Sequence, residues 1–385
     1  MHKYDYIIIG AGLSGLTLAA ELADYLLDNN KTLLIIDPDF THFTNRTWSF
    51  WTQDPAPYAD ISLQTWDHIR IAHGRQELWK PIAPFTYVSI DGSSFRRQKL
   101  EELAKNPQIS YQQDTIVNRM QQQDKLVSLK GEQHTYIAEY VFDSSFDIQQ
   151  LKDYEGVQLY QQFVGYFIRS KRGLGNQKMV DMMDFRTEQK EAIAFFYVLP
   201  FKDQTLVEYT LFTDTIRERR LFEEKLEAYL ANKFDPGAYT IVDQEEGIIP
   251  MSSYRFRSKH SHIIPIGTAG GCSKASSGYT FTFAQRQAKR IVRSLQAKKS
   301  LKGKVFSGSG RFDFYDRTIL RIFYKHPERS AAILTQLFAL NPTEQVLKFL
   351  NNETSIWEEI KLFSSLPIPL FSKYALLELL KPGRK

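Results

Sequence analysis

The chain has 385 residues, of which 43% are hydrophobic and 24% charged, so it can bury a large core and is long for one compact domain. Its 49 basic and 44 acidic residues leave a net charge of +5 that is spread along the chain, which argues against nucleic-acid binding. The single cysteine, Cys272, excludes an intrachain disulfide and fits a reducing compartment. The eight histidines show no metal-ligand spacing, so no metal site is expected.

The N-terminal segment predicts a β-α-β unit. An apolar run at residues 4–9 is followed by a glycine cluster and then by apolar residues at helical spacing, and a second apolar strand at 31–36 ends at Asp37-Pro38. The uncharged run 7–20 is shorter than the roughly 20 residues that span a bilayer, and its glycines do not suit a secretory signal. We therefore expect a cytoplasmic protein without a transmembrane helix.

The rest of the chain predicts strands first and helices last. The expected strands are a meander over 109–142 and runs at 163–168, 192–199, 205–212 and 263–266. Helices are expected at about 216–232 and 281–295 and, after a Gly/Ser/Lys-rich linker at 298–310, through the remainder, with breaks at Pro327, Pro342, Pro367 and Pro369. This pattern predicts an α/β protein with a Rossmann-like domain, a sheet-based substrate domain and a helical C-terminal region.

The first glycine cluster is a dinucleotide-binding motif in the right context, between a strand and a helix. Gly10 allows the sharp turn, Gly12 lets a pyrophosphate approach the backbone, and Gly15 lets the helix pack against the strand. The phosphate then meets the positive end of the helix, so Ala11 and Leu13 also belong to the predicted site. Asp37, at the end of the second strand, is placed to accept hydrogen bonds from an adenosine ribose.

A second glycine turn lies late in the chain. Its residues Gly267, Thr268, Ala269 and Gly270 follow a strand and precede a helix, which resembles the turn that carries the flavin phosphate and ribityl group in FAD-dependent hydroxylase-like flavoproteins. The resemblance favours FAD over NAD. Thr268 stands where that pattern usually has an acid, so a hydroxyl replaces a charged hydrogen-bond acceptor.

Further segments resemble the lycopene β-cyclase family, in the family's order and over nearly the whole chain. They are residues 45–50 (NRTWSF), 142–145 (FDSS), 160–165 (YQQFVG), 182–186 (MMDFR), 196–200 (FYVLP), 206–210 (LVEYT) and 277–281 (SGYTF), and 312–327 resembles the family's C-terminal helical region. The resemblance implies an isomerase of carotenoid biosynthesis. It would convert lycopene through γ- to β-carotene at the membrane surface, with reduced FAD as cofactor and NADPH or NADH as reductant, and without net redox change.

The resemblance also implies residue roles. Glu208 matches the first glutamate of the family's Phe-Leu-Glu-Glu-Thr motif, the proton donor of ring closure, and burial would keep it protonated. Tyr209 replaces the second acid of that motif, which favours a mechanism with one acid. Arg46 joins the expected cofactor-binding residues. Aromatic side chains that could face the carbocation are those of Trp48, Phe50, Phe196, Tyr197 and Tyr279.

The chain is expected to divide into three parts. We assign residues 1–70, 95–150 and 255–300 to the FAD-binding domain, 71–94 and 151–254 to the substrate domain, and 301–385 to the helical region. The apolar stretch 356–380, flanked by Lys373, Lys381, Arg384 and Lys385, is expected to contact a membrane peripherally.

Two alternatives to a cyclase remain open. One is an FAD-dependent monooxygenase or isoprenoid reductase with net redox chemistry, and the other is a non-catalytic flavin or carotenoid carrier.

Overall fold

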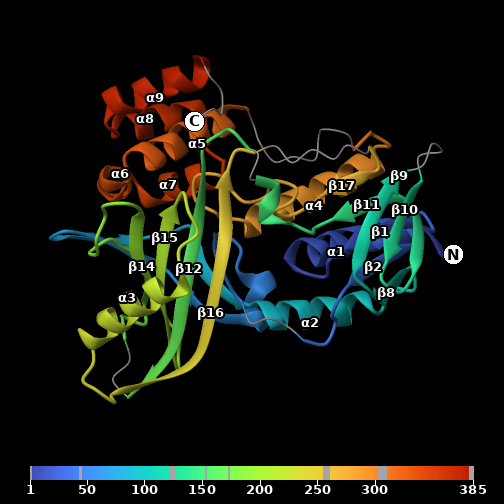
Figure 1. Cartoon of the computed structure of the whole chain (residues 1–385), viewed down its shortest axis with the longest axis horizontal. Coiled ribbons are helices and arrows are strands. Elements are labelled where there is room, and N and C mark those ends of the chain that lie inside the picture. The colour runs from blue at the N-terminus through green and yellow to red at the C-terminus, as the bar shows by residue number, and fades with distance from the viewer. Residues whose placement is uncertain are drawn as a thin grey trace.

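The computed structural model describes residues 2–42, 46–121, 126–151, 154–171, 174–254, 261–301 and 310–380. Two large sheets, one small sheet and a group of C-terminal helices make up the fold (Figure 1). Within these ranges, no helix is long and apolar enough to cross a membrane. Asn45, linker residues 302–309 and the basic residues Lys381, Arg384 and Lys385 lie outside the described residues.

The first sheet contains the predicted β-α-β unit. Its order is β8-β2-β1-β11-β10-β9, with β17 beside β11, and its strands are β1 (His2–Ile9), β2 (Leu33–Asp37), β8 (Ile109–Gln113), β9 (Ile116–Gln121), β10 (Val127–Gly131), β11 (Thr135–Asp143) and β17 (Ile263–Pro265). Strands β8, β2, β1, β11 and β17 run parallel to one another. Strand β10 is antiparallel to both of its neighbours, β11 and β9. Three helices lie beside this sheet: α1 (Leu13–Asp28), α2 (Gly92–Leu103) and α4 (Phe281–Gln296). Helix α1 packs on α4.

The second sheet combines strands that are far apart in the sequence. Its order is β16-β12-β15-β14-β13-β5-β6, and its strands are β5 (His68–His73), β6 (Gln76–Pro81), β12 (Gln158–Ser170), β13 (Met179–Asp184), β14 (Ile193–Pro200), β15 (Thr205–Thr213) and β16 (Tyr239–Ser252). Helix α3 (Arg219–Ala231) covers one face with its buried residues Phe222, Leu226 and Leu230. The small sheet β3-β7-β4 consists of β3 (Thr47–Thr52), β4 (Ser62–Trp66) and β7 (Thr86–Asp91), and the short 3-10 helices are η1 (Ala56–Ile61) and η2 (Ile148–Leu151).

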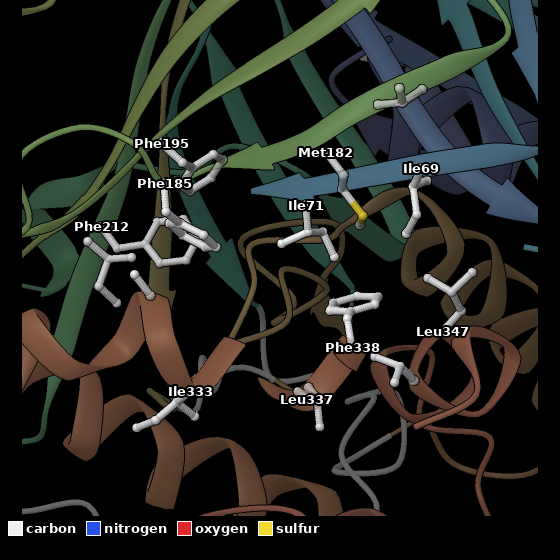
Figure 2. Close-up of a cluster of buried hydrophobic side chains, with 14 of the residues drawn as sticks. Ile69, Ile71, Met182, Phe185, Phe195, Phe212, Ile333, Leu337, Phe338 and Leu347 are labelled. Carbon is white, nitrogen blue, oxygen red and sulfur yellow. The ribbon is translucent and has the colours of Figure 1, made fainter. Parts of the chain in front are cut away.

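The C-terminal helices lie over the other face of the second sheet. They are α5 (Gly310–Lys325), α6 (Pro327–Leu340), α7 (Thr343–Leu350), α8 (Ile356–Ser364) and α9 (Ile368–Leu380). Figure 2 shows Phe338 of α6 pointing towards Ile71 and Met182 of the sheet, and Ile333 and Leu337 of the same helix belong to the same buried cluster. Pro327, Pro342 and Pro367 lie at or just before helix starts, as predicted. The predicted break at Pro369 is wrong, because this proline lies in the first turn of α9, where its missing N–H costs no helical hydrogen bond.

Candidate active site

A cavity of about 1040 Å³ is lined by residues from the first glycine turn, the second sheet and the C-terminal helices. Its wall is formed by the first turn of α1, by one face of the second sheet and by side chains of α5 to α9. Representative residues from these three regions are Gly12, Leu13, Phe195, Leu206, Phe338 and Phe371. Most of this wall is apolar, as suits a large hydrophobic ligand.

The first glycine turn opens onto this cavity at the N-terminus of α1. Gly12 and Leu13 line the cavity, and a Cβ at Gly12 would have no atom within 4 Å. Gly10 adopts φ +97°, and a Cβ there would lie 2.1 Å from Ser144 Oγ. A Cβ at Gly15 would lie 1.9 Å from the Gly10 carbonyl oxygen, so this glycine allows the close approach of helix and turn.

Asp37 binds the glycine turn itself. Its Oδ2 accepts a 2.6 Å hydrogen bond from the Ala11 backbone N–H, and its Oδ1 accepts one of 3.1 Å from Arg96. Ala11 is fully buried, and neither it nor Asp37 lies on the cavity wall, whereas Arg96 does. Asp37 therefore anchors the turn and Arg96 together. Arg46, just before β3, also lines the cavity.

The late glycine turn packs against the first. Gly267 has φ +62°, and a Cβ there would lie 2.5 Å from Ser14 Oγ, so the two turns are in direct contact. Its N–H donates to Gln287 Oε1 at 2.9 Å. Gly267 and Thr268 reach the cavity, but Ala269 and Gly270 lie behind them and do not line it.

Of the five predicted aromatic residues, the structure brings three to the cavity: Trp48, Tyr197 and Tyr279. Phe50 instead stacks on Phe281 at 3.9 Å within the core of the first sheet. Phe196 stacks on Tyr229 of α3 at 4.1 Å, on the opposite face of the second sheet. The expectation for Phe196 is corrected by the alternation of side chains along a strand, since its neighbour Tyr197 takes the cavity face.

Glu208 lies in the middle of β15, on the cavity face. It is 7% exposed, and its Oε1 accepts a 2.6 Å hydrogen bond from the Thr210 hydroxyl. Among the described residues no basic side chain pairs with it. Burial, and next the charge of Glu245, raise the pKa of Glu208 to about 8, while the bond from Thr210 lowers it. Its carboxyl group is thus largely protonated at neutral pH.

Tyr209, which takes the place of a second acid in the resembled motif, faces α3. It is 3% exposed and packs edge-on against Phe222 at 5.9 Å. The cavity nevertheless has a second carboxyl group next to Glu208. It belongs to Glu245 of β16, and neither this residue nor its long strand is predicted above from the sequence. The apolar runs that flank residues 243–246, three of which are acidic, could have indicated the strand.

These features define an α/β protein with a glycine-turn nucleotide fold, a second sheet and a helical C-terminal region. Solved structures of flavoproteins share that fold. A geranylgeranyl bacteriochlorophyll reductase-like protein from Thermoplasma acidophilum is 12% identical with a TM-score of 0.64, and 98% of this chain and 100% of that chain are covered. A flavoprotein/dehydrogenase from Cytophaga hutchinsonii is 14% identical with a TM-score of 0.64, and 98% of this chain and 100% of that chain are covered. The p-nitrophenol 4-monooxygenase from Pseudomonas putida is 13% identical with a TM-score of 0.59, and 100% of each chain is covered.

The sequence identifies the family within this fold. The family model described as lycopene cyclase protein matches residues 5–375. The chain therefore belongs to the lycopene cyclase family, as its motifs predict. A search of curated protein sequences finds no match.

Proposed function

We propose that this protein closes the end rings of lycopene by acid catalysis, with Glu208 as proton donor and without net redox change. The observation that carries the proposal is a carboxyl group buried on the wall of a large apolar cavity, with its pKa raised to about 8. An alkene is a very weak base, so the donor must be a neutral acid held against it in an environment that excludes water.

The reaction balances in protons and electrons. The Glu208 carboxyl gives its proton to the terminal double bond of the polyene, which leaves a cation on the neighbouring carbon. The next double bond supplies an electron pair to form the ring bond. A C–H bond beside the new cation then breaks: its electron pair forms the ring alkene, and its proton is released, which balances the proton that Glu208 gave. The aromatic faces of Trp48, Tyr197 and Tyr279 on the cavity wall can stabilise the positive charge.

The glycine turns fit FAD. The open space in front of Gly12 admits a pyrophosphate at the positive end of α1, and Arg46, Arg96, Gly267 and Thr268 surround that end of the cavity. Asp37 would hold the turn in shape and offer its remaining lone pairs to the ribose. Reduced FAD, when bound, supplies negative charge that stabilises the cation. NADPH or NADH would provide the reducing electrons.

The helical region provides a route from a membrane for the lycopene and its partly cyclised products. Leu362 and Phe371 line the cavity from α8 and α9, and Ile368 both lines it and is 57% exposed. The same two helices expose large apolar side chains at Ile356, Trp357, Ile360, Leu376, Leu379 and Leu380. We name these six residues the apolar rim and propose that they insert into the lipid interface.

Pigment conversion tests the cyclase proposal. The protein is expressed in cells that accumulate lycopene, beside Glu208→Gln and a control, Glu224→Gln, whose carboxylate lies exposed on α3 and pairs with Arg220. Wild type and the control should yield cyclic carotene, whereas Glu208→Gln should retain flavin and leave lycopene unchanged. Lycopene untouched by wild type would instead favour a flavin enzyme with net redox chemistry.

Vesicle binding tests the apolar rim. Replacing Trp357 and Leu379 together by Ser should reduce co-sedimentation with phospholipid vesicles and slow turnover of lycopene delivered in vesicles. Turnover of lycopene delivered in detergent micelles should change little, because neither residue lines the cavity. Leu63→Ser, an exposed leucine of β4, is the control. Equal vesicle binding by wild type and the double variant would refute this surface.

A further inference from the structure

Glu208 and Glu245 lie in one row across the second sheet, on either side of Gly165. In the strand register, Gly165 of β12 is the partner of Glu208 on β15 and also of Glu245 on β16. All three residues therefore share one face, and both glutamates line the cavity. Gly165 itself places no side chain between them, and the atom nearest to its missing Cβ is Leu206 Cδ1 at 2.8 Å. A Cβ there would lie 3.5 Å from both Glu208 Cβ and Glu245 Cγ.

We propose that Glu245 is the base of the ring closure and accepts the proton that leaves the ring, across Gly165 from the donor Glu208. This inference rests on the proposed cyclase function. One proton leaves Glu208 for the terminal alkene carbon, and one returns from the ring carbon to Glu245, while the C–H electron pair becomes the ring double bond. The pair thus ends each ring closure with the same single proton, which passes back from Glu245 to Glu208.

The contacts of the two carboxyl groups fit these different roles. Glu245 Oε2 accepts a 3.0 Å hydrogen bond from the Thr47 backbone N–H, which favours its anion. Burial raises the pKa of Glu245 to about 7, against the bond from Thr47 and the charge of Arg46, which lower it. The pKa of Glu208 is raised to about 8, and neither a backbone N–H nor a cation stabilises its anion as Thr47 and Arg46 stabilise that of Glu245, so the contacts favour Glu245 as the group that ionises. The charge of an ionised Glu245 opposes ionisation of Glu208, which favours a pair that holds one proton.

Within the part of the chain that the structure describes, no cation neutralises Glu208. The groups that act on one or other carboxyl from neighbouring elements are Arg46, Tyr87, Tyr197 and Asp243. Other acidic residues of the cavity wall are already paired. Asp316 forms a 2.7 Å ion pair with Lys274, and Glu246 forms one of 2.9 Å with Arg219.

The pH dependence of turnover tests the assignment. Flavin-loaded wild type, Glu245→Gln, Glu245→Asp and the control Glu224→Gln are assayed with lycopene from pH 5 to 9, with flavin content and thermal unfolding measured in parallel. We expect a bell-shaped profile for wild type and the control. Glu245→Gln should lose about a hundredfold in rate, lose the acid limb, and move the alkaline limb to lower pH because the neighbouring negative charge is gone. Glu245→Asp should restore part of the rate and the acid limb.

An infrared titration of the protonated carboxyl stretch separates failure of this inference from failure of the cyclase proposal. If wild type turns over lycopene but Glu245→Gln keeps the wild-type pH profile, or loses activity only in proportion to lost flavin, Glu245 is not the base. If wild type does not cyclise lycopene, the proposed function falls, and with it the base role. In that case the infrared titration still tests the charge coupling between the two carboxyl groups. The coupling is refuted if Glu208 titrates at the same pH in wild type and in Glu245→Gln.

Discussion

The hydroxyl groups of Tyr87 and Tyr197 are hydrogen-bonded at 2.7 Å, and Tyr197 is the strand partner of Glu208. Tyr87 is 2% exposed, so Tyr197→Phe leaves a buried hydroxyl without this partner and should lower the free energy of unfolding by about 1–3 kcal/mol. The double variant with Tyr87→Phe should cost less than the sum of the single variants, because no orphan hydroxyl remains. Urea unfolding of all four proteins measures this, and additive costs would contradict the coupling.

Gly165→Ala should impair catalysis more than folding. The new methyl group would lie 2.8 Å from Leu206 Cδ1, a flexible side-chain end, and would occupy the gap between Glu208 and Glu245. We expect lycopene turnover to fall about tenfold or more, since small displacements of reacting groups cost large factors in rate. Adding Leu206→Val as a control removes the contact with Leu206 but leaves the gap filled, so activity should stay low. Recovered activity would attribute the loss to Leu206.

Thr210→Val should shift the alkaline limb of the activity profile to higher pH. The Thr210 hydroxyl donates a 2.6 Å hydrogen bond to Glu208 and lowers the pKa of that carboxyl by stabilising its anion. Valine keeps the shape of threonine but removes the donor, so Glu208 should stay protonated to higher pH. Thr210→Ser retains the hydroxyl and should keep the wild-type limb. A limb that moves to lower pH in the valine variant would contradict this account.

Glu208→Gln should stabilise the protein above pH 5. The folded-state pKa of Glu208 is about 8 against a usual value of 4.5, so the native state holds a proton that the unfolded state has released. Folding stability that depends on this group is complete below pH 4.5 and is lost as pH rises through 8. At pH 7 the loss is roughly 3 kcal/mol, at about 1.36 kcal/mol per pH unit.

The measurement for that prediction is chemical unfolding at pH 5, 7 and 8.5. The stability advantage of Glu208→Gln over wild type should grow across the series, while Glu224→Gln, at an exposed position, should track wild type. A constant difference between wild type and Glu208→Gln would mean that Glu208 has an ordinary pKa in the folded protein.

The sequence predicts well those features that depend on local spacing. The glycines of the first turn, the strand that carries Glu208 and the helix after the late turn are found within a few residues of their predicted bounds. In each, a short apolar run is followed by a turn or by residues at helical spacing. The division of the chain into three domains with the stated boundaries stays a prediction.

The face of a strand and the partner of a carboxyl group depend instead on pairing between distant segments. Phe196 and Tyr197 are adjacent aromatic residues on β14, and only the sheet's position between α3 and the cavity decides which of them faces the ligand. Likewise, Glu245 meets Glu208 because β12 inserts between their strands, with a glycine at the shared register position. No local spacing predicts that juxtaposition.

Substitutions at Gly12 and Gly10 should separate flavin binding from folding. A methyl group at Gly12 meets no protein atom within 4 Å and points into the space proposed for the pyrophosphate, so Gly12→Ala should fold normally and lose most of its flavin. Gly10→Ala should instead destabilise the fold, because φ is +97° and the methyl group would lie 2.1 Å from Ser144 Oγ. Flavin absorbance of the purified proteins and their thermal unfolding give the two readouts. A Gly12→Ala protein with full flavin content would show that no phosphate approaches this turn.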